Sequence, residues 1–446
     1  MIRNRFGIAL MMTLVLVATA CGGGGGSSAP PAASVAASVG GAASPSAAAA
    51  ATPAATPGAS DAIPVPPGDA DLVIWADDKR AAALKPLAAK YAADNNVKVV
   101  VEAISTDIIP KFLTASQAGT APDIVVWAHD VIGNLVRNGF IDPIQLSDTS
   151  GFDPLAIKGM TFGGQLYGIP YSVENIALFR NTDLVPTAPA TMEDLVTAGK
   201  ALVASGKTKE IMSLQVGQKG DAYHLWPLWV SGGGSFFAST STGDPDPKNV
   251  TVDSAGSMAA GQKIAALGEK GAGALKRSID DKNAIPLFFN KQSPFLISGP
   301  WAVADITKAG VKYDISPIPP FAGGKPAGPF IGVNGFYVAS KGKHKTLAQD
   351  FATSYLTTLE VQTALYAAEP RRPALTAAVD QVKAQDPNIA LFQAAAKDGT
   401  ILPAIPEMGQ VWGPFGVAEA ALVGGSDVTS TLTSAAKAIR DGIAGP

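Results

Sequence analysis

Acidic residues and large aromatic rings recur together along the sequence, and this combination indicates what chemistry the chain can do. The acids are Asp78, Asp130, Glu174 and Asp221, and the rings are Trp75, Trp127, Tyr223, Trp226, Trp301 and Trp412. The face of an aromatic ring matches the apolar C–H face of a pyranose, and a carboxylate accepts hydrogen bonds from sugar hydroxyls. The pattern therefore suits the binding of a neutral sugar.

A catalytic use of these residues is the alternative. His129 and Asp130 are adjacent at the end of a predicted strand, where consecutive side chains point to opposite faces, so they do not easily form a proton relay. We expect His129 to support its loop by hydrogen bonding. The sequence has no GxSxG motif and no Gly-rich phosphate loop. Hydrolysis of a glycosidic bond between two carboxylates stays open.

Composition excludes several other classes of function. The three histidines, at 129, 224 and 344, lack metal-ligand spacing, and the single cysteine, Cys21, excludes an intrachain disulfide and a cysteine-cluster metal site. We therefore expect no metal and no cofactor. The 34 basic and 37 acidic residues give a formal charge of −3 with no long basic run, so nucleic acid is not an expected partner.

The N-terminus predicts export and lipid attachment. Arg3 and Arg5 precede an apolar run over residues 6–20, and Cys21 ends the motif LVATAC. The run is shorter than the ~20 apolar residues that span a membrane. It predicts a lipoprotein signal peptide over residues 1–20, with cleavage before Cys21 and acylation of its thiol. Residues 21–68, rich in Gly, Ala, Ser and Pro, predict a disordered tether that holds the protein outside the cytoplasm at the cell membrane.

Strands and helices alternate in the segment that must position the first acids and rings. The sequence predicts strands at 72–76, 97–104 and 123–127, and helices at 79–94 and 107–117. This alternation predicts a parallel sheet with helices on its faces, where ligands lie beyond the carboxyl ends of the strands. Trp75, Asp77, Asp78, Trp127 and Asp130 lie at or just past such ends, so we expect them to gather on one rim.

The rest of the chain predicts a second folded unit. With 446 residues, 47% of them hydrophobic, the chain is too long for one ordinary core and can fill two lobes of an α/β fold. Thr191, with Asp194 three residues later, predicts the capped start of a helix. Residues 328–340 predict an extended crossing segment, and residues 346–368 predict one long helix.

Seven motifs occur in the order in which they occur in maltose/maltodextrin-binding proteins, the solute-binding subunits of ABC importers. They are LVIWADDK, PDIVVWAHD, GIPYSVENIALFRN, DAYHLWPLWVSGGG, FLISGPWAVADI, FIGVNGFYVAS and IPEMGQVWGPF. The chain from Asp69 to Pro446 resembles this family. The resemblance implies a two-lobed, periplasmic-binding-protein-like (type II) fold with a hinge and a ligand cleft between the lobes. The implied N-terminal lobe is 69–172 and 336–381, and the C-terminal lobe is 173–335 and 382–446, with crossings near Val173, Gly332 and Asp386.

The resemblance also implies which residues bind the sugar. In the first lobe they are the pair Asp78 and Lys79, the stacking ring of Trp127, and the hydroxyl acceptors Asp130 and Glu174. In the second lobe they are the carboxylate Asp221 and the stacking rings of Tyr223, Trp301 and Trp412. Val131 and Gly416 stand where the family carries arginines, and these two departures leave the preferred sugar open.

The function implied by the resemblance is binding, not catalysis. A monomeric, lipid-anchored protein would capture maltose, maltodextrin or a related α-glucoside by hinge closure and deliver it to the ABC permease. A binding protein for another oligosaccharide, a sensor of sugar occupancy and a secreted glycoside-active enzyme are the alternatives.

Overall fold

The computed structural model describes residues 63, 67–241 and 243–445. The chain divides into the units Met1–Ser60 and Asp61–Pro446, and the elements below belong to the second unit. The predicted signal peptide, Cys21 and nearly all of the predicted tether lie outside the described residues. In the part of the chain that is described, no helix combines the length and the apolar character needed to cross a bilayer.

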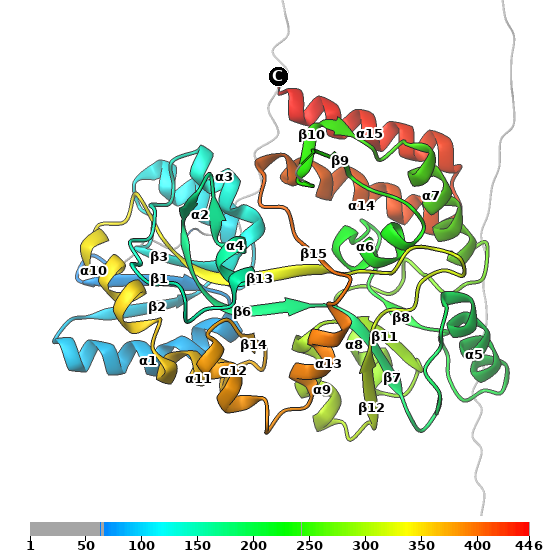
Figure 1. The fold of residues 1–446 in the computed structure, drawn as a ribbon, viewed down its shortest axis with the longest axis horizontal. Coiled ribbons are helices and arrows are strands. Elements are labelled where there is room, and N and C mark those ends of the chain that lie inside the picture. The colour runs from blue at the N-terminus through cyan, green and yellow to red at the C-terminus, as the bar shows by residue number, and fades with distance from the viewer. Residues whose placement is uncertain (1–62, 64–66, 242, 446) are drawn as a thin grey trace, which may run out of the picture. The chain divides into compact units, whose positions relative to one another are not determined.

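A mixed sheet organises the first lobe (Figure 1). Its strands are β1 (Leu72–Ala76), β2 (Val99–Ala103), β3 (Ile124–Ala128), β6 (Gly168–Asn175), β13 (Phe330–Val338), β14 (Arg372–Pro373) and β15 (Thr400–Ile401). The order is β14-β6-β13-β3-β1-β2, and β15 pairs with β13. β1 is parallel to β2 and β3, as predicted, but β13 is antiparallel to β3 and β6. The prediction of a parallel sheet is therefore correct only for the first three strands.

Helices cover this sheet and share its core. They are α1 (Asp78–Asn95), α2 (Ile108–Ala118), α3 (Ile132–Arg137), α4 (Pro154–Gly159), α10 (Lys345–Asp350), α11 (Leu359–Ala368) and α12 (Thr376–Val382). The small hairpin β4 (Thr161–Phe162) and β5 (Gln165–Leu166) follows α4. Trp75 is fully buried among these elements, and its indole N–H donates to Glu102. The expectation that Trp75 lies on the rim is wrong, because its side chain points to the core side of β1.

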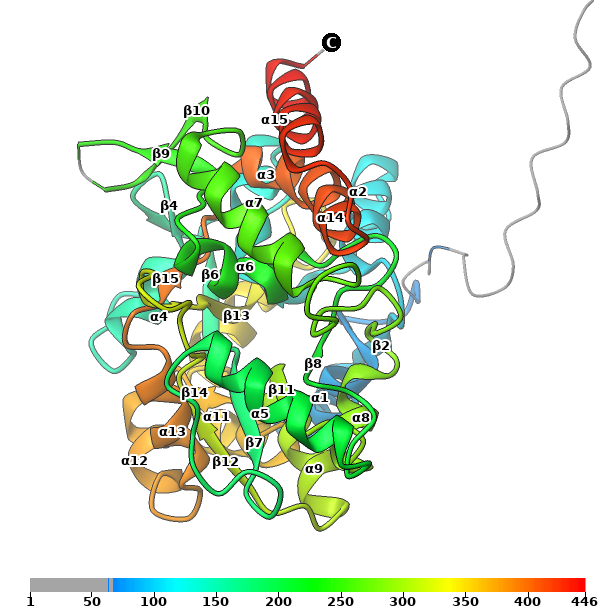
Figure 2. The ribbon, with the colours of Figure 1, turned by 90° about the vertical axis from the view of Figure 1, so that its right-hand side faces the viewer.

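A smaller sheet organises the second lobe. Its order is β12-β7-β11-β8, with β7 (Ala177–Asn181), β8 (Ser213–Leu214), β11 (Phe295–Ser298) and β12 (Tyr313–Ser316). Its helices are α5 (Met192–Ala204), α6 (Ala222–Ser231), α7 (Ala255–Leu267), α8 (Ala284–Phe289), α9 (Val303–Lys308), α13 (Asn388–Ala395), α14 (Gly409–Val423) and α15 (Val428–Ala444). The hairpin β9 (Phe237–Ser239) and β10 (Pro245–Val250) lies beside α15, and α7, α14 and α15 pack together at one end (Figures 1 and 2).

Two paired strands connect the lobes. β6 continues almost directly into β7, which carries the chain from the first sheet to the second. β13 pairs with β6 along its length, and Figure 1 shows the two strands side by side, running from the first sheet toward the second lobe. Phe330 at the start of β13 packs in the second core, whereas Val333 packs in the first. The fold is thus two-lobed α/β, and the lobe boundaries given above stay a prediction.

Two details of the helices test the sequence reasoning. The capping box predicted at Thr191 is confirmed, since its hydroxyl accepts from the backbone of Asp194 and the Asp194 carboxylate accepts from the backbone of Thr191. The single helix predicted over 346–368 is wrong, because a π-helical turn at Phe351–Tyr355 and a break before α11 divide it. The hydroxyls of Thr353, Ser354 and Thr357 donate to carbonyls four residues back, a contact that bends helices.

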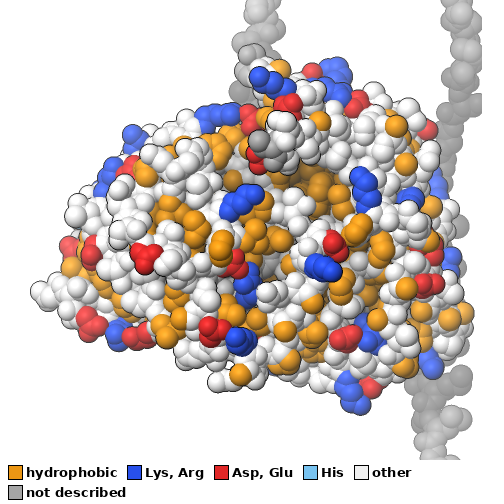
Figure 3. Space-filling view, viewed as in Figure 1, with side chains coloured by type: hydrophobic (Ala, Val, Ile, Leu, Met, Phe, Trp, Pro, Cys, Tyr) orange, Lys and Arg blue, Asp and Glu red, His pale blue; other side chains and the backbone are white. Residues whose placement is uncertain are grey.

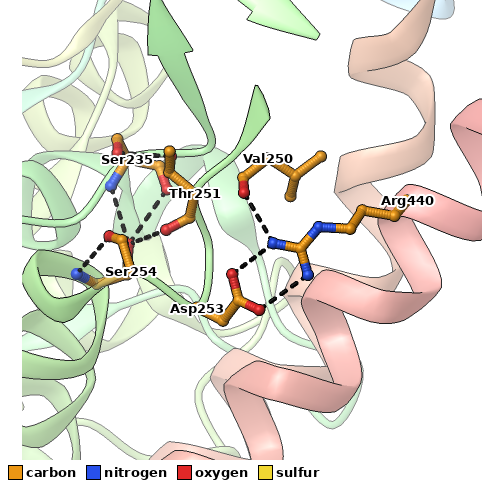
Figure 4. A network of polar contacts seen from close by, with 7 residues as sticks. Ser235, Val250, Thr251, Asp253, Ser254 and Arg440 are labelled. Atoms are coloured by element: carbon orange, nitrogen blue, oxygen red, sulfur yellow. Dashed lines mark hydrogen bonds and ion pairs between the residues drawn. The ribbon is translucent and has the colours of Figure 1, made fainter. Parts of the chain in front are cut away.

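A polar network fixes the last helix to its lobe (Figure 4). The guanidinium of Arg440 on α15 donates to both carboxylate oxygens of Asp253 and to the carbonyl of Val250. Ser254, next in the chain, caps α7 by accepting from the backbone of Ser257. One arginine therefore holds α15 against the strand end that precedes α7.

Candidate ligand-binding cleft

A cleft of about 550 Å³ lies between the two lobes. Residues from both lobes line it: Arg80, Trp127, Ala128, Asp130, Glu174, Tyr223, His224, Trp301, Gly332, Asn334, Arg371, Leu402 and Trp412. The volume falls in the range of about 300–1,000 Å³ that is typical of small-molecule sites. The structure thus brings together six predicted site residues: Trp127, Asp130, Glu174, Tyr223, Trp301 and Trp412.

The aromatic rings reach the cleft from four different elements. Trp127 lies in β3, Tyr223 in the first turn of α6 and Trp412 in α14, all partly buried. Trp301 follows the turn Gly299-Pro300, and its ring folds back over that turn so closely that a Cβ on Gly299 would lie 2.2 Å from it. Glycine is therefore required at 299 for the Trp301 ring to lie where it does.

Two acids of the cleft differ in their surroundings. Asp130 lies in a short 3-10 turn after β3, and burial raises the pKa of its carboxyl to about 6. Glu174, near the end of β6, forms an ion pair with Arg371 in which both side chains are about nine-tenths buried. Asp130 is therefore the cleft acid that titrates near neutral pH, whereas Glu174 is held by a fixed cation.

Two arginines that the sequence reasoning missed complete the cleft. The Arg80 guanidinium pairs with Asp77, donates to Tyr171 Oη and to Asn334 Oδ1 at 2.8 Å, and lies 5.9 Å from the Trp127 ring. The Arg371 guanidinium pairs with Glu174 and Glu369 and lies 5.4 Å from the Trp301 ring. Burial lowers the pKa of Arg371 to about 10, so it stays charged at neutral pH. Each guanidinium thus lies near one tryptophan of the cleft.

The start of α1 explains why Arg80, and not its neighbours, reaches the cleft. Asp77 caps α1 by accepting from the backbone N–H of Arg80, which places Arg80 in the first turn with its side chain turned inward. Asp78 and Lys79 occupy the exposed positions of that turn, and Asp78 accepts from the Ser105 hydroxyl. Neither Asp78 nor Lys79 lines the cleft.

Asp221 also lies outside the cleft lining, and its contacts explain why. It caps α6 by accepting from the backbone N–H of His224 at 3.0 Å, and it accepts from Gln215 Nε2. Its own backbone N–H donates to Glu419 Oε2 at 2.7 Å. Asp221 lines a separate hollow of about 350 Å³ with residues 215–220. The carboxylate of Asp221 is thus used in capping α6 and binding Gln215, and its backbone N–H links the start of α6 to α14.

His129 has the structural role that the sequence predicts. Its Nδ1 accepts from the backbone N–H of Val333 at 3.0 Å, and its Nε2 lies 2.7 Å from the carbonyl of Leu402. Burial lowers the pKa of His129 to about 4, so the ring is neutral. This buried histidine joins β3 to both β13 and the segment after β15.

The two positions where arginines were expected have packing roles. Val131 packs against the core of the first lobe. Gly416 in α14 meets the loop before α6, where a Cβ on Gly220 would lie 1.8 Å from the Gly416 carbonyl and Gly220 has a φ of +75°. Two glycines therefore let a loop and a helix touch backbone to backbone.

Gly416→Arg is expected to lower the free energy of unfolding by about 1–3 kcal/mol, without adding a ligand contact. A Cβ at Gly416 would lie 2.8 Å from the carbonyl of Lys219, so the backbone must shift to admit any side chain. Urea denaturation measures the change. Val417→Arg is the matched control, because Val417 is 62% exposed. Equal stability of the two variants would contradict the packing role of Gly416.

A second cavity of about 510 Å³ shares Leu402 with the cleft. Trp226, Phe236 and Phe330 are among its apolar lining residues, and the rings of Trp226 and Phe330 stack with centroids 4.1 Å apart. Figure 3 shows a hydrophobic hollow beneath the β9–β10 hairpin, and it shows basic and acidic side chains interspersed over this face. The acids and arginines of the cleft do not line this cavity.

Comparison with known proteins identifies a matching family and several similar proteins. Residues 86–391 match the family described as bacterial extracellular solute-binding protein. The galactooligosaccharide-binding protein of Bacillus subtilis (strain 168) is 26% identical over 390 residues, covering 82% of this chain and 88% of that protein. The maltodextrin-binding protein MdxE of the same organism is 28% identical, covering 80% and 85%. A maltooligosaccharide ABC transporter solute-binding lipoprotein of Streptococcus pneumoniae (strain ATCC BAA-255 / R6) is 26% identical, covering 77% and 82%.

Proposed function

Because the chain belongs to the family of bacterial extracellular solute-binding proteins, we propose that its cleft captures a neutral oligosaccharide for import by an ABC transporter. The observation that carries the proposal is the cleft lining, in which four aromatic rings from both lobes accompany Asp130, Glu174 and two arginines. Rings of this kind stack on pyranose faces, and the carboxylates and amide groups bind hydroxyls.

The charges of the cleft favour a neutral ligand over an anionic one. Arg80 is paired with Asp77, and Arg371 is paired with both Glu174 and Glu369. A free carboxylate or phosphate group would have to compete with these buried pairs for each guanidinium. Sugar hydroxyls can instead form hydrogen bonds with the carboxylate lone pairs and guanidinium N–H groups that the ion pairs leave free, and the ion pairs then stay intact.

The division of the lining between the lobes supports capture by closure. Trp127, Asp130 and Arg80 belong to the first lobe, and Tyr223, Trp301 and Trp412 belong to the second. β6 and β13, which connect the lobes, are the elements about which the lobes would rotate. A sugar that contacts the residues of both lobes binds more tightly to the closed state than to the open one, and it therefore favours closure. The closed state would dock on the permease.

The proposed ligands are maltose, maltodextrin or a related α-glucoside, because two of the relatives are named for maltodextrin and maltooligosaccharide. A galactooligosaccharide is the second candidate, favoured by the galactooligosaccharide-binding relative. Calorimetry against maltose, maltotriose, trehalose, galactooligosaccharides, cellobiose and xylobiose tests both. We expect an α-glucoside to bind with a micromolar Kd, about −8 kcal/mol. Binding of galactooligosaccharides, cellobiose or xylobiose alone would overturn the first assignment, and no binding at all would overturn the function.

The same sugars test whether the chain has an enzymatic role, since paired carboxylates also serve glycoside hydrolysis. We propose that the protein binds without reacting. Prolonged incubation with maltotriose should release no glucose or maltose above a control without protein. Release above that control would overturn the binding-only role.

We further propose that the mature chain is a monomer attached to the cell membrane by lipid on Cys21, because a signal-like segment precedes this cysteine and a relative is named a lipoprotein. Cys21→Ser is expected to move the protein from the membrane fraction to the soluble fraction. Fractionation followed by immunoblotting measures this change. Membrane retention of the variant would contradict lipid attachment at Cys21.

Affinity for the sugar is expected to fall as the pH drops through about 6, because burial raises the pKa of Asp130 to about 6 and only the ionised carboxylate is a strong acceptor. The loss should reach roughly fivefold at pH 5, the difference between a charge-assisted and a neutral hydrogen bond. The raised pKa of Asp130 also affects stability. Above pH 3.8 this carboxyl lowers the free energy of unfolding, because it ionises more readily in the unfolded chain than in the folded one. Calorimetry from pH 5 to 8 tests this, with Asp130→Asn expected to bind weakly and with a flatter profile. A wild-type profile as flat as that of the variant would contradict it.

A further inference from the structure

His224 has a position in the cleft that neither its sequence context nor the comparisons assign. It lies in the first turn of α6, beside Tyr223, and lines the cleft with only 8% of its surface exposed. Its Nδ1 lies 3.0 Å from Asp221 Oδ2, which is within ion-pair distance but without the alignment of a hydrogen bond. The spacing of three residues on a helix brings the ring back over the residue that caps it.

Asp221 is itself held in place by three elements. Its Oδ1 accepts from the backbone of His224, its Oδ2 accepts from Gln215, and its backbone N–H donates to Glu419 on α14. Burial by itself would raise the pKa of Asp221, but attraction to His224 and the hydrogen bonds from His224 and Gln215 lower it overall. An ionised carboxylate is therefore fixed beside one nitrogen of the His224 ring.

This arrangement favours one nitrogen of a neutral His224 ring as the site of its proton. The negative charge of Asp221 attracts the proton to the nearer nitrogen, Nδ1, and Nε2 then keeps its lone pair. Within the described part of the chain, no hydrogen bond reaches Nε2, and this atom is not among the buried unpaired ones. The ring meets Tyr223 edge to face with centroids 5.4 Å apart and Trp301 with centroids 6.1 Å apart.

We propose that His224 is a specificity-determining residue of the cleft, whose Nε2 accepts a hydrogen bond from a sugar hydroxyl beside the rings of Tyr223 and Trp301. Asp221 acts through His224 as a positioning residue, in place of the direct contact that the sequence predicts for it. The inference rests on the proposed function, because it names one contact of the same site. A ring nitrogen with a free lone pair is an acceptor that suits a hydroxyl donor.

His224→Phe tests the contact while keeping the ring. Phenylalanine retains the edge-to-face contacts with Tyr223 and Trp301 but has no nitrogen. Affinity for maltotriose, or for the galactooligosaccharides if they bind the wild-type protein more tightly, is expected to fall about tenfold, the usual effect of one lost hydrogen bond. His344→Phe is the matched control, because His344 lies in the first lobe outside the cleft lining, and its affinity should equal that of the wild type.

Nitrogen NMR of the side chains gives a readout that a merely structural role would not move. The chain has only three histidines, so ¹⁵N-histidine labelling gives few signals, and His224→Phe assigns those of residue 224. Saturating sugar should shift the His224 Nε2 signal as its lone pair accepts a hydrogen, with His129 and His344 unchanged. Asp221→Asn keeps the helix cap but turns an amide N–H toward Nδ1. The proton should then move to Nε2, and the affinity should fall.

The outcomes separate this inference from the proposed function. Wild-type protein that binds the sugar, with His224→Phe of equal affinity and an unshifted Nε2 signal, would overturn the role of His224 alone. Wild-type protein that binds none of the sugars would overturn the proposed function and this inference together.

Discussion

Arg371→Ala is expected to lower the free energy of unfolding by about 3–5 kcal/mol, the usual cost of removing one partner from a buried ion pair. The Arg371 side chain is 9% exposed and pairs with Glu174 and Glu369, whose carboxylates are nearly as buried. Without the guanidinium, two buried carboxylates would lose the cation that they share. The loss exceeds what the side chain contributes by packing, because the charges left behind have no water to solvate them.

Urea denaturation at pH 7 measures this loss, and the next residue provides a control. Arg372 pairs with Asp153 through Nη2 at 2.7 Å, and its side chain is more exposed, at 16%. Arg372→Ala should therefore cost clearly less than Arg371→Ala. Adding Glu174→Gln to Arg371→Ala should recover part of the stability, because it removes one of the orphaned charges. If the two single variants were equally stable, the buried pairs of Arg371 would contribute no more than the more exposed pair of Arg372.

Trp301→Ala is expected to weaken sugar binding by thirtyfold or more, about 2 kcal/mol, because a large ring in the cleft contributes both stacking and exclusion of water. Trp301 lies in the cleft from the second lobe, edge to face with His224 and beneath the Arg371 guanidinium. Truncation removes the stacking surface and leaves Arg371 with one neighbour fewer. Since Trp301 is only partly buried, the fold should persist.

Calorimetry with maltotriose measures this effect, and thermal unfolding shows whether the fold is intact. Trp301→Phe keeps a smaller ring and should lose much less affinity than the alanine variant. An alanine variant that binds within threefold of the wild type would mean that the sugar does not touch Trp301.

The sequence predicted the parts of the fold that depend on local pattern. Short apolar strands and the Thr191 capping box were recognised because their signals lie within a few neighbouring residues. The mixed direction of the first sheet was not predicted, because β13 reaches β3 from about two hundred positions later in the chain. No local pattern specifies which distant strand fills the gap between β3 and β6.

The residues of the candidate site also differ in whether a local sequence signal or a contact between distant segments places them. Trp127 and Asp130 follow a strand end, where the direction of the sheet already places them near a ligand. Arg80 was missed in favour of Lys79 because the inward position of the first turn depends on the cap at Asp77. Arg371 was missed because its position depends on β14 pairing with β6, a contact between distant segments. His224 could have been suspected from its spacing of three residues after a capping aspartate.

The central place of β13 has a consequence for how the protein is made. β13 lies between β3 and β6, so the sheet of the first lobe lacks its middle strand until the ribosome has passed residue 338. Contacts between segments so far apart in the chain fold slowly, because the long loop must close before they form. β3 therefore lacks its partner strand β13 while most of the polypeptide is synthesised. The sheet of the first lobe is therefore expected to close late in folding, after most of the other strands have formed.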